Sequence, residues 1–314
     1  MKFSLILCLA VIADEIFGDP RGFPHPVRLI GHVINFWHKT FFTNTDSYIR
    51  GLAVAVMTLM TAGLSVFVML YVSGGNIIVQ VYLLYSALAW RDLKDETLPI
   101  LSSLMKHDTV SAGKYLSFVV GRDTENLSDT GIIRAVIETV AENSVDGVIS
   151  VIFFAVIGYA VNHDYGMSIA VWLFKSASTL DSMLGYESLG KFGEPSAKLD
   201  DMMNFIPARL GGVIIILAGI FAGGNVAEGF KVFMSDRMKH KSPNSAHAES
   251  AFAGVLGVRL GGGAYYGGKF EAREWLNEGG NDPEVSDIIR AWRVLDGACA
   301  LSVIIAVEAV EFLI

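Results

Sequence analysis

The residues best suited to chemistry lie in one charged stretch, Gly121–Gly147, which strongly apolar segments flank on both sides. Within it Arg134, Glu138, Glu142 and Asp146 recur every four residues, a spacing that predicts one charged stripe along a helix. Carboxylates are ligands for Mg²⁺, and guanidinium groups bind phosphate. The pattern therefore predicts chemistry on a charged substrate, carried out beside a membrane.

Five carboxylates are the candidates for holding a metal ion: Glu138, Glu142, Asp146, Asp200 and Asp201. Mg²⁺ usually keeps several waters and takes only one or two protein carboxylates, so they cannot all be ligands. For any one of them the alternative is structural. Arg134 and Glu138, for example, could form an ion pair on a solvated helix face, worth ~0.3–0.5 kcal/mol. The cluster as a whole favours a metal site.

The cations that could bind a phosphate or a carboxylate are Arg28, Arg122, Arg209, Arg259 and Lys175. The planar guanidinium binds such groups through two parallel hydrogen bonds, although Arg209, at the mouth of an apolar helix, equally fits an interfacial anchor. Lys175 lies midway along an apolar segment, where an unpaired ammonium costs about 2.5–3.5 kcal/mol. We therefore expect Lys175 to face a polar cavity, a carboxylate or a bound phosphate.

His25, between Pro24 and Pro26, could be a general base for an attacking amine, but a lone histidine is more often structural. The seven histidines show no H-x-x-x-H spacing, which leaves a zinc site unsupported. The segment Gly263–Phe270 nearly matches a P-loop. Phe270 stands where the loop needs a hydroxyl for Mg²⁺, and no strand is expected before it, so we reject that interpretation. No residue is identified as the general base.

Composition places these residues in a membrane protein. Hydrophobic residues make up 52% of the 314 and charged residues 18%, against about 45–50% and 25% in soluble domains. Gly51–Val72 holds 22 residues without a charge, enough for a spanning helix. Six weaker candidates are Phe3–Ile16, Ile77–Trp90, Gly147–Val161, Met167–Leu184, Phe205–Ala222 and Val294–Ile314. We expect an all-α integral membrane protein, one domain over 1–314, with about five to seven membrane helices.

The charges also predict how the chain is oriented. Nearly all Lys and Arg residues lie in the polar segments 18–50, 91–146, 185–204 and 225–293, which the positive-inside rule places in the cytoplasm of a multi-pass cell-membrane protein. The Gly- and Ala-rich run Ala246–Gly268 is a candidate for a re-entrant or membrane-docked element. A net charge of −8 argues against a nucleic-acid partner. Cys8 and Cys299 are expected to be inert core residues.

Five ordered blocks of sequence, running from about Ala13 to Gly268, are similar to those of a known family. They are Asp14 with GDPRGFPHPVRLIG (18–31), Gly121–Gly147, KSASTLDSMLGY (175–186), AKLDDMMNFIPARLGG (197–212) and SPNSAHAESAFAGVLGVRLGGGAYYGG (242–268). In these blocks the sequence resembles the adenosylcobinamide-phosphate synthase family of cobalamin biosynthesis. Ala246–Ala248 and Gly263–Ala264 depart from the Gly-Trp-Pro and Pro-Asn expected there.

The resemblance implies an ATP- and Mg²⁺-dependent ligase. It would join adenosylcobyric acid to (R)-1-amino-2-propanol O-phosphate and give adenosylcobinamide phosphate, with the lipid bilayer as a further partner. Self-association into a homo-oligomer is left open. The candidates for catalysis are Glu138, Glu142, Asp146, Lys175 and His25. Those for binding are Arg28, Arg122, Asp123, Asn143, Asp181, Ser182, Asn204, Arg209, Ser242, Asn244, Glu249 and Arg259; Asp14 and Asp19 belong to the first block.

Two other classes of function compete with the ligase. A non-catalytic membrane sensor could use the same scaffold, and a corrin transporter would account for Lys175 and the broken apolar segments. A sensor needs few phosphate or metal ligands, so the number of carboxylates and arginines favours the enzyme. All of these candidates are expected to meet at one cytoplasmic pocket beside the lipid.

Overall fold

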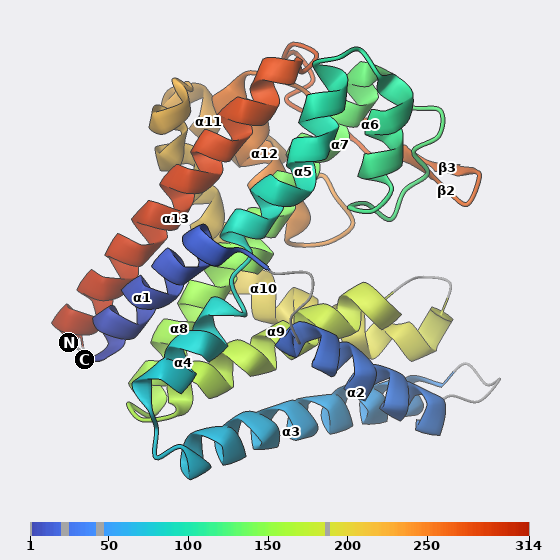
Figure 1. Ribbon diagram of the computed structural model, residues 1–314. Coiled ribbons are helices and arrows are strands. Elements are labelled where there is room, and N and C mark those ends of the chain that lie inside the picture. Colours follow the sequence, from blue (N-terminus) through green and yellow to red (C-terminus); the bar gives the residue numbers. More distant parts are fainter. Residues whose placement is uncertain (1, 20–24, 42–46, 186–188, 314) are drawn as a thin grey trace. The chain divides into compact units, whose positions relative to one another are not determined.

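The computed structural model describes residues 2–19, 25–41, 47–185 and 189–313, and most of them are helical (Figure 1). The chain divides into two compact units. The first unit comprises Met1–Ala89, Ser150–Phe205 and Val303–Ile314, and the second comprises Trp90–Ile149 and Ile206–Ser302. Each unit is built from separate stretches of chain, so neither could be excised as one continuous segment.

Helices form the first unit. They are α1 (Lys2–Phe17), α2 (Pro26–Phe41), α3 (Tyr48–Val72), α4 (Ile77–Tyr85), α8 (Ser150–Val161), α9 (Gly166–Leu184) and the first half of α10 (Gly190–Ala218). Helix α3 packs against α2 and α9, and α8 packs against α9 (Figure 1). In the core, the Trp172 indole donates a hydrogen bond to the Leu83 carbonyl at 3.0 Å, which fixes α9 against α4.

Glycine sets the close approach of α8 to α9. A Cβ atom on Gly158 would collide with the carbonyl oxygen of Gly166, and one on Gly166 with the carbonyl oxygen of Gly158. Small residues let helix backbones approach this closely, an arrangement common between helices in membranes. The short connection between Val161 and Gly166 therefore joins two tightly packed helices.

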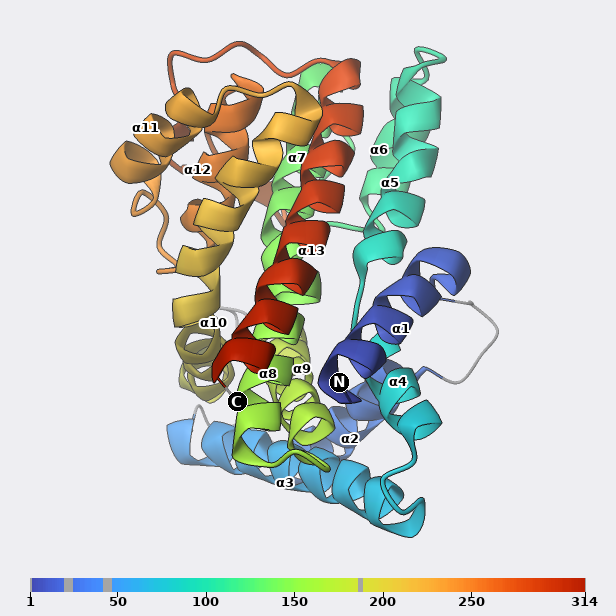
Figure 2. The ribbon, with the colours of Figure 1, turned by 90° about the vertical axis from the view of Figure 1, so that its left-hand side faces the viewer.

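The second unit contains α5 (Trp90–Leu104), α6 (Thr109–Leu116), α7 (Asp129–Ser144), the π-helical turn η1 (Val145–Ile149), the rest of α10, η3 (Gly219–Ala222), α11 (Val226–Asp236), α12 (Ser245–Leu256) and most of α13 (Val285–Leu313). Its centre is α12, of which every residue from Ala246 to Leu256 is buried. Helices α7 and α11 pack against α12, and α5 lies beside α6 (Figures 1 and 2).

Within the described ranges, four short strands accompany the helices, and sequence did not predict them. Strands β1 (Leu260–Gly261) and β4 (Trp275–Leu276) pair antiparallel, and β2 (Ala264–Tyr266) and β3 (Lys269–Glu271) form a hairpin. Gly267 and Gly268 make the hairpin turn with φ of 55° and 79°, values that favour glycine. The run Ala246–Gly268, predicted to be re-entrant or membrane-docked, is thus the buried helix α12 followed by strands.

Three stretches of the described chain are long and apolar enough to cross a membrane: Tyr48–Val72, Asp129–Val161 and Gly190–Ala222. The predicted span at 51–72 is among them. Helices α1 and α4, with 16 and 9 residues, are shorter than the ~17–25 that a simple span needs. By length and composition the described helices therefore supply three candidate spans, fewer than the expected five to seven. Exposed apolar side chains along α3, such as Met60 and Leu64, both 63% exposed, suit contact with lipid.

Candidate functional site

The candidate residues divide between the two units, and each group is described within its own unit. The first unit holds Asp14, Asp19, His25, Arg28, Lys175, Asp181, Ser182, Asp200, Asp201 and Asn204. The second holds Arg122, Asp123, Glu138, Glu142, Asn143, Asp146, Arg209, Ser242, Asn244, Glu249 and Arg259. That all of them share one pocket stays a prediction.

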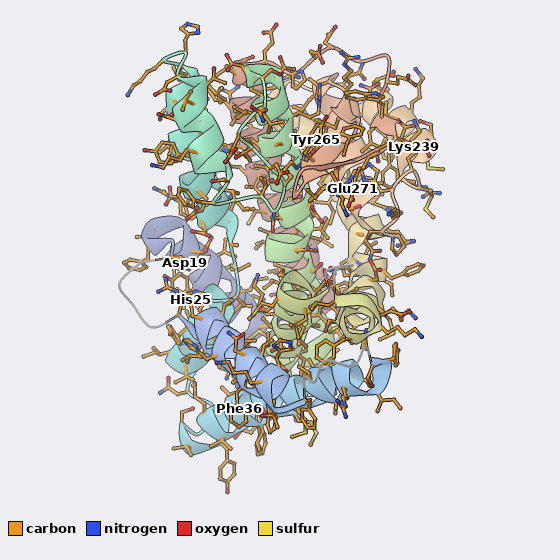
Figure 3. All side chains as sticks on the ribbon, turned by 90° about the vertical axis from the view of Figure 1, so that its right-hand side faces the viewer. Asp19, His25, Phe36, Lys239, Tyr265 and Glu271 are labelled. Carbon is orange, nitrogen blue, oxygen red and sulfur yellow. The ribbon has the colours of Figure 1, made fainter. Side chains whose placement is uncertain are left out.

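His25 is paired with a carboxylate in the first unit. Its Nε2 lies 3.1 Å from Asp19 Oδ1, just before α2 begins at Pro26 (Figure 3). Asp14 is fully buried on α1, and the nearby Tyr85 hydroxyl donates to the Gly18 carbonyl. An aspartate partner fixes the orientation of an imidazole. Pro24, on which part of the sequence argument for His25 rested, lies outside the described residues.

A second acidic group joins α9 to α10. The Asn204 amide donates to both carboxylate oxygens of Asp200 at 3.1 Å, and Ser150 donates to the Asn204 oxygen at 2.7 Å. Asp181, Asp201 and Lys175 all lie close enough to Asp200 to interact with it electrostatically. Lys175, for which a polar cavity, a carboxylate or a bound phosphate was expected, thus interacts electrostatically with Asp200 on the next helix. Ser182 makes only a local hydrogen bond, to the Ser178 carbonyl.

Glu138 is the buried centre of the second unit's charged group. Its Oε2 lies 2.7 Å from the Arg122 guanidinium, and its Oε1 accepts a hydrogen bond of 2.7 Å from the Gly261 amide. The Arg122 side chain is 15% exposed and the Glu138 side chain is 6% exposed. Burial opposes the charge on Arg122, but the charge and hydrogen bond of Glu138 outweigh it and raise the Arg122 pKa. A metal ion at Glu138 would therefore share the carboxylate with these two donors.

The charged side chains of the predicted stripe on α7 lie in different surroundings along the helix. Arg134 makes its ion pair with Asp282, at 3.1 Å, and the pairing with Glu138 that sequence offered as the structural alternative is not the one observed. Glu142 is exposed, and Asp146 lies in the π-helical turn η1. Such turns are rare and frequent at functional sites. Asn143 donates to the Thr139 carbonyl within the helix.

Arg259, a candidate for binding a phosphate or a carboxylate of a substrate, binds a carboxylate of the protein itself. Its Nε and Nη2 donate to the two Asp282 oxygens at 2.8 and 2.9 Å. These bonds lower the Asp282 pKa. The guanidinium groups of Arg259 and Arg134 also lie over the Trp275 ring, 4.9 and 4.6 Å from its centroid. The four side chains tie the β1–β4 pair to α7.

A cavity of about 850 Å³ opens in the second unit beside α6. It is lined by Thr109, Val110, Gly113, Lys114, Ser117, Arg122, Asp123, Thr124, Glu125, Asn126, Leu127, Gly267 and Gly268. The lining offers two cations, two carboxylates and several hydroxyl groups. A cavity of roughly 300–1,000 Å³ suits a nucleotide-sized or cofactor-sized ligand.

Asp123 joins two walls of this cavity. Its carboxylate accepts hydrogen bonds from the Gly267 and Gly268 amides at 3.1 and 2.7 Å, and its own amide donates to the Tyr265 carbonyl at 2.8 Å. Figure 3 labels Tyr265 and Glu271, which belong to the hairpin held in this way. Successive backbone amides that converge on one carboxylate form an anion-binding turn. Asp123 thus closes the loop 117–127 onto the β2–β3 hairpin.

The residues Ser242-Pro243-Asn244 lead into α12. Asn244 occupies the position before the helix, but its side chain makes no capping bond and instead accepts a hydrogen bond of 3.3 Å from Arg209. Ser242 accepts one from the Asn244 amide at 3.3 Å. The segment thus leads into the start of α12 without a side-chain cap.

His240 is a functional candidate that sequence reasoning missed. Its Nδ1 lies 3.6 Å from Glu249 Oε1, and the two side chains are 4% and 3% exposed. Burial raises the Glu249 pKa, and Glu138 adds to this rise. Burial opposes protonation of His240, but Glu249 outweighs it, so the His240 pKa is raised as well. Nine positions separate the two residues, a spacing that matches no metal or catalytic motif, so sequence gave no signal for the pair.

The described chain is mostly helical, has three candidate membrane spans by length and composition, and carries charged clusters within each unit. The family described as CobD/Cbib protein matches residues 7–295, and the chain belongs to this family. The resemblance stated from the sequence motifs is thereby confirmed.

Several curated relatives match along nearly their whole length. A cobalamin biosynthesis protein CobD of Clostridium perfringens is 38% identical over 96% of each chain. The CobD of Clostridium tetani is 40% identical over 84% of each chain, and the cobalamin biosynthesis protein CbiB of Salmonella arizonae is 34% identical over 97% of each. No solved structure matches the chain.

Proposed function

We propose that this protein is a cobalamin-biosynthetic amide ligase. It uses ATP and Mg²⁺ to join adenosylcobyric acid to (R)-1-amino-2-propanol O-phosphate and gives adenosylcobinamide phosphate. The observation that carries this proposal is the match, along nearly the whole chain, to relatives named for cobalamin biosynthesis. The cations and carboxylates of the two units add the groups that such chemistry requires.

The chemistry proceeds in two steps. A propionate oxygen of the corrinoid attacks the γ-phosphorus of ATP, forming an O–P bond, and ADP leaves. The amine nitrogen then attacks the acyl carbon, the carbon–oxygen bond to phosphate breaks, and inorganic phosphate leaves while the nitrogen loses one proton. Water must be excluded because it would hydrolyse the acyl phosphate before the amine reacts.

The cavity beside α6 supports the binding of a phosphate-bearing substrate. Lys114 and Arg122 supply positive charge, and the Thr124 hydroxyl can donate a hydrogen bond. The Thr109 and Ser117 hydroxyls already donate to Asp129 and to the Lys114 carbonyl. We assign the nucleotide or the aminopropanol phosphate to this cavity. Its backbone turn at Gly267–Gly268 already binds one anion, the Asp123 carboxylate.

Among the described residues no group of three or more His, Cys, Asp or Glu side chains is arranged to hold a metal ion. A site with only one or two carboxylates can still hold Mg²⁺, because this ion completes its shell with waters and substrate phosphates. Asp200 and Asp201, with Asp181 nearby, supply only oxygen donors, as Mg²⁺ prefers. They are the metal ligands we propose in the first unit. In such chemistry Mg²⁺ supplies charge that stabilises phosphate oxygens.

The proposal is tested with purified protein, ATP, Mg²⁺, adenosylcobyric acid and aminopropanol phosphate. We expect ADP release that depends on the corrinoid, together with an amide product of the mass of adenosylcobinamide phosphate. Protein that releases no ADP and forms no amide under these conditions rejects the ligase. Corrinoid uptake by proteoliposomes without ATP turnover would instead identify the transporter.

A further inference from the structure

The pair His240–Glu249 leaves two buried polar atoms without a partner. His240 Nε2 and Glu249 Oε2 each have less than 1 Å² of exposed surface, and neither makes a hydrogen bond to any residue that the structure describes. The other polar atoms of the two side chains, His240 Nδ1 and Glu249 Oε1, lie 3.6 Å apart. Buried polar groups are nearly always hydrogen-bonded, so two such atoms on one pair call for an explanation.

The surroundings define the charge of the pair. Ser245 Oγ lies 3.4 Å from His240 Nδ1, and the charged groups that face the pair are Arg273, Glu138 and Arg122. A buried carboxylate beside a buried imidazole has the lowest free energy when the two groups share one proton. An isolated charge at this position would cost several kcal/mol. With one proton on the pair, His240 Nε2 carries hydrogen and donates, while Glu249 Oε2 accepts. The pair can therefore bind a group that both accepts and donates, as an amine does.

The pair is electrostatically coupled to the wall of the cavity. Arg122 lines the cavity, binds Glu138 at 2.7 Å and also interacts with Glu249. The sequence supplied no general base, and this pair provides groups of the right type in a site that excludes water.

We propose that His240 and Glu249 form the subsite for the primary amine of the substrate and accept its proton as the amide bond forms. This inference rests on the ligase function proposed above. As nitrogen bonds to the acyl carbon and phosphate leaves, the proton on nitrogen passes to the pair, which later releases it to solvent. The amine and the acyl phosphate supply every atom, so no further reactant is needed.

The test compares two nucleophiles on the same acyl phosphate. Hydroxylamine is largely unprotonated at neutral pH, so it attacks an acyl phosphate without a base and yields a hydroxamate. The variants are His240→Gln and Glu249→Gln, with His163→Gln as the control because His163 is an exposed histidine of the first unit. Each is assayed with ATP, Mg²⁺ and adenosylcobyric acid, first with aminopropanol phosphate and then with hydroxylamine.

We expect His240→Gln to lose about 10²–10⁴-fold in kcat for the amide, the usual contribution of acid–base catalysis, and to keep hydroxamate formation within about threefold of wild type. Its residual amide rate should rise with pH as more amine becomes unprotonated, more steeply than that of wild type. Hydroxamate formation also shows that the variant is folded.

Two results overturn this inference while leaving the ligase standing. One is amide formation by His240→Gln at the wild-type rate, and the other is equal loss of amide and hydroxamate, which would make the pair structural. If wild-type protein forms neither product, the ligase proposal itself has failed. The His163→Gln control is expected to form both products at wild-type rates.

Discussion

Arg122 and Glu138 meet 2.7 Å apart in the interior of the second unit, and the Glu138 side chain is only 6% exposed. This pair joins the residue that lines the cavity to the helix α7 that carries the predicted charged stripe. Because the Gly261 amide donates to its other oxygen, the Glu138 carboxylate accepts hydrogen bonds from two donors and can reorient little. The pair therefore fixes the position of Arg122 at the cavity.

Removing one member of this pair should destabilise the protein more than removing both. Arg122→Met leaves the buried Glu138 carboxylate without its cation, which costs about 3–5 kcal/mol. The double variant Arg122→Met, Glu138→Leu removes the stranded charge and should recover part of that loss. Melting temperatures of the four proteins in one detergent measure the coupling. A double variant whose loss equals the sum of the two single losses would show that the residues act independently.

Asp123 is expected to hold the hairpin against the loop 117–127. In Asp123→Ala the Gly267 and Gly268 amides lose their acceptor, so hydrogen exchange across Ala264–Glu271 should speed up by about tenfold, as loss of ~1–2 kcal/mol of local stability implies. The phosphate-bearing substrate assigned to this cavity, ATP or aminopropanol phosphate, should also bind more weakly because a cavity wall has loosened. Glu125→Ala, in the same lining, is the control and should leave exchange unchanged. An unchanged exchange rate in Asp123→Ala would show that the Asp123 carboxylate does not hold the hairpin.

His247 should make stability fall in mild acid. Burial and the charges of Arg209 and Arg237 lower its pKa from 6.5 to about 4. Between these two values the unfolded chain binds a proton at this histidine and the folded chain does not, so folding weakens as pH falls, by at most about 1.4 kcal/mol per pH unit. His247→Phe should flatten the dependence of melting temperature on pH between 6.5 and 4. An unchanged slope would contradict the lowered pKa.

Gly158 should tolerate no side chain. A Cβ there meets the Gly166 backbone and Ala170, so Gly158→Ala should separate α8 from α9 and cost about 1–3 kcal/mol. Gly121→Ala is the matched control, since a Cβ at Gly121 has nothing within 4 Å. Thermal unfolding of both variants in detergent measures the difference. Equal melting temperatures would show that the two helices can move apart at no cost.

Sequence reasoning predicted the parts of this protein that repeat a simple pattern. The uncharged run 51–72 became part of α3, and the run 129–144 became α7, because hydrophobic length and helical spacing are local properties. The family followed from ordered motifs and was confirmed by the match over 7–295. The residue types needed for phosphate and metal chemistry were likewise visible in the sequence.

What sequence could not supply was the choice of partners. Arg134 and Glu138 are one helical turn apart, yet Arg134 pairs with Asp282 and Glu138 with Arg122, since long-range packing selected those groups. The strands β1 to β4 were missed because each has only two or three residues, too few for a period-two pattern. His240 was missed because its partner, Glu249, is brought to it by the fold.

The central claim is that a corrinoid carboxylate is activated by phosphate from ATP before an amine attacks it. The most direct test uses adenosylcobyric acid carrying ¹⁸O in the reacting carboxylate, incubated with the protein, ATP, Mg²⁺ and aminopropanol phosphate. We predict that one ¹⁸O atom appears in inorganic phosphate for each amide formed, measured by mass spectrometry. Amide formation with no ¹⁸O in phosphate would contradict the account.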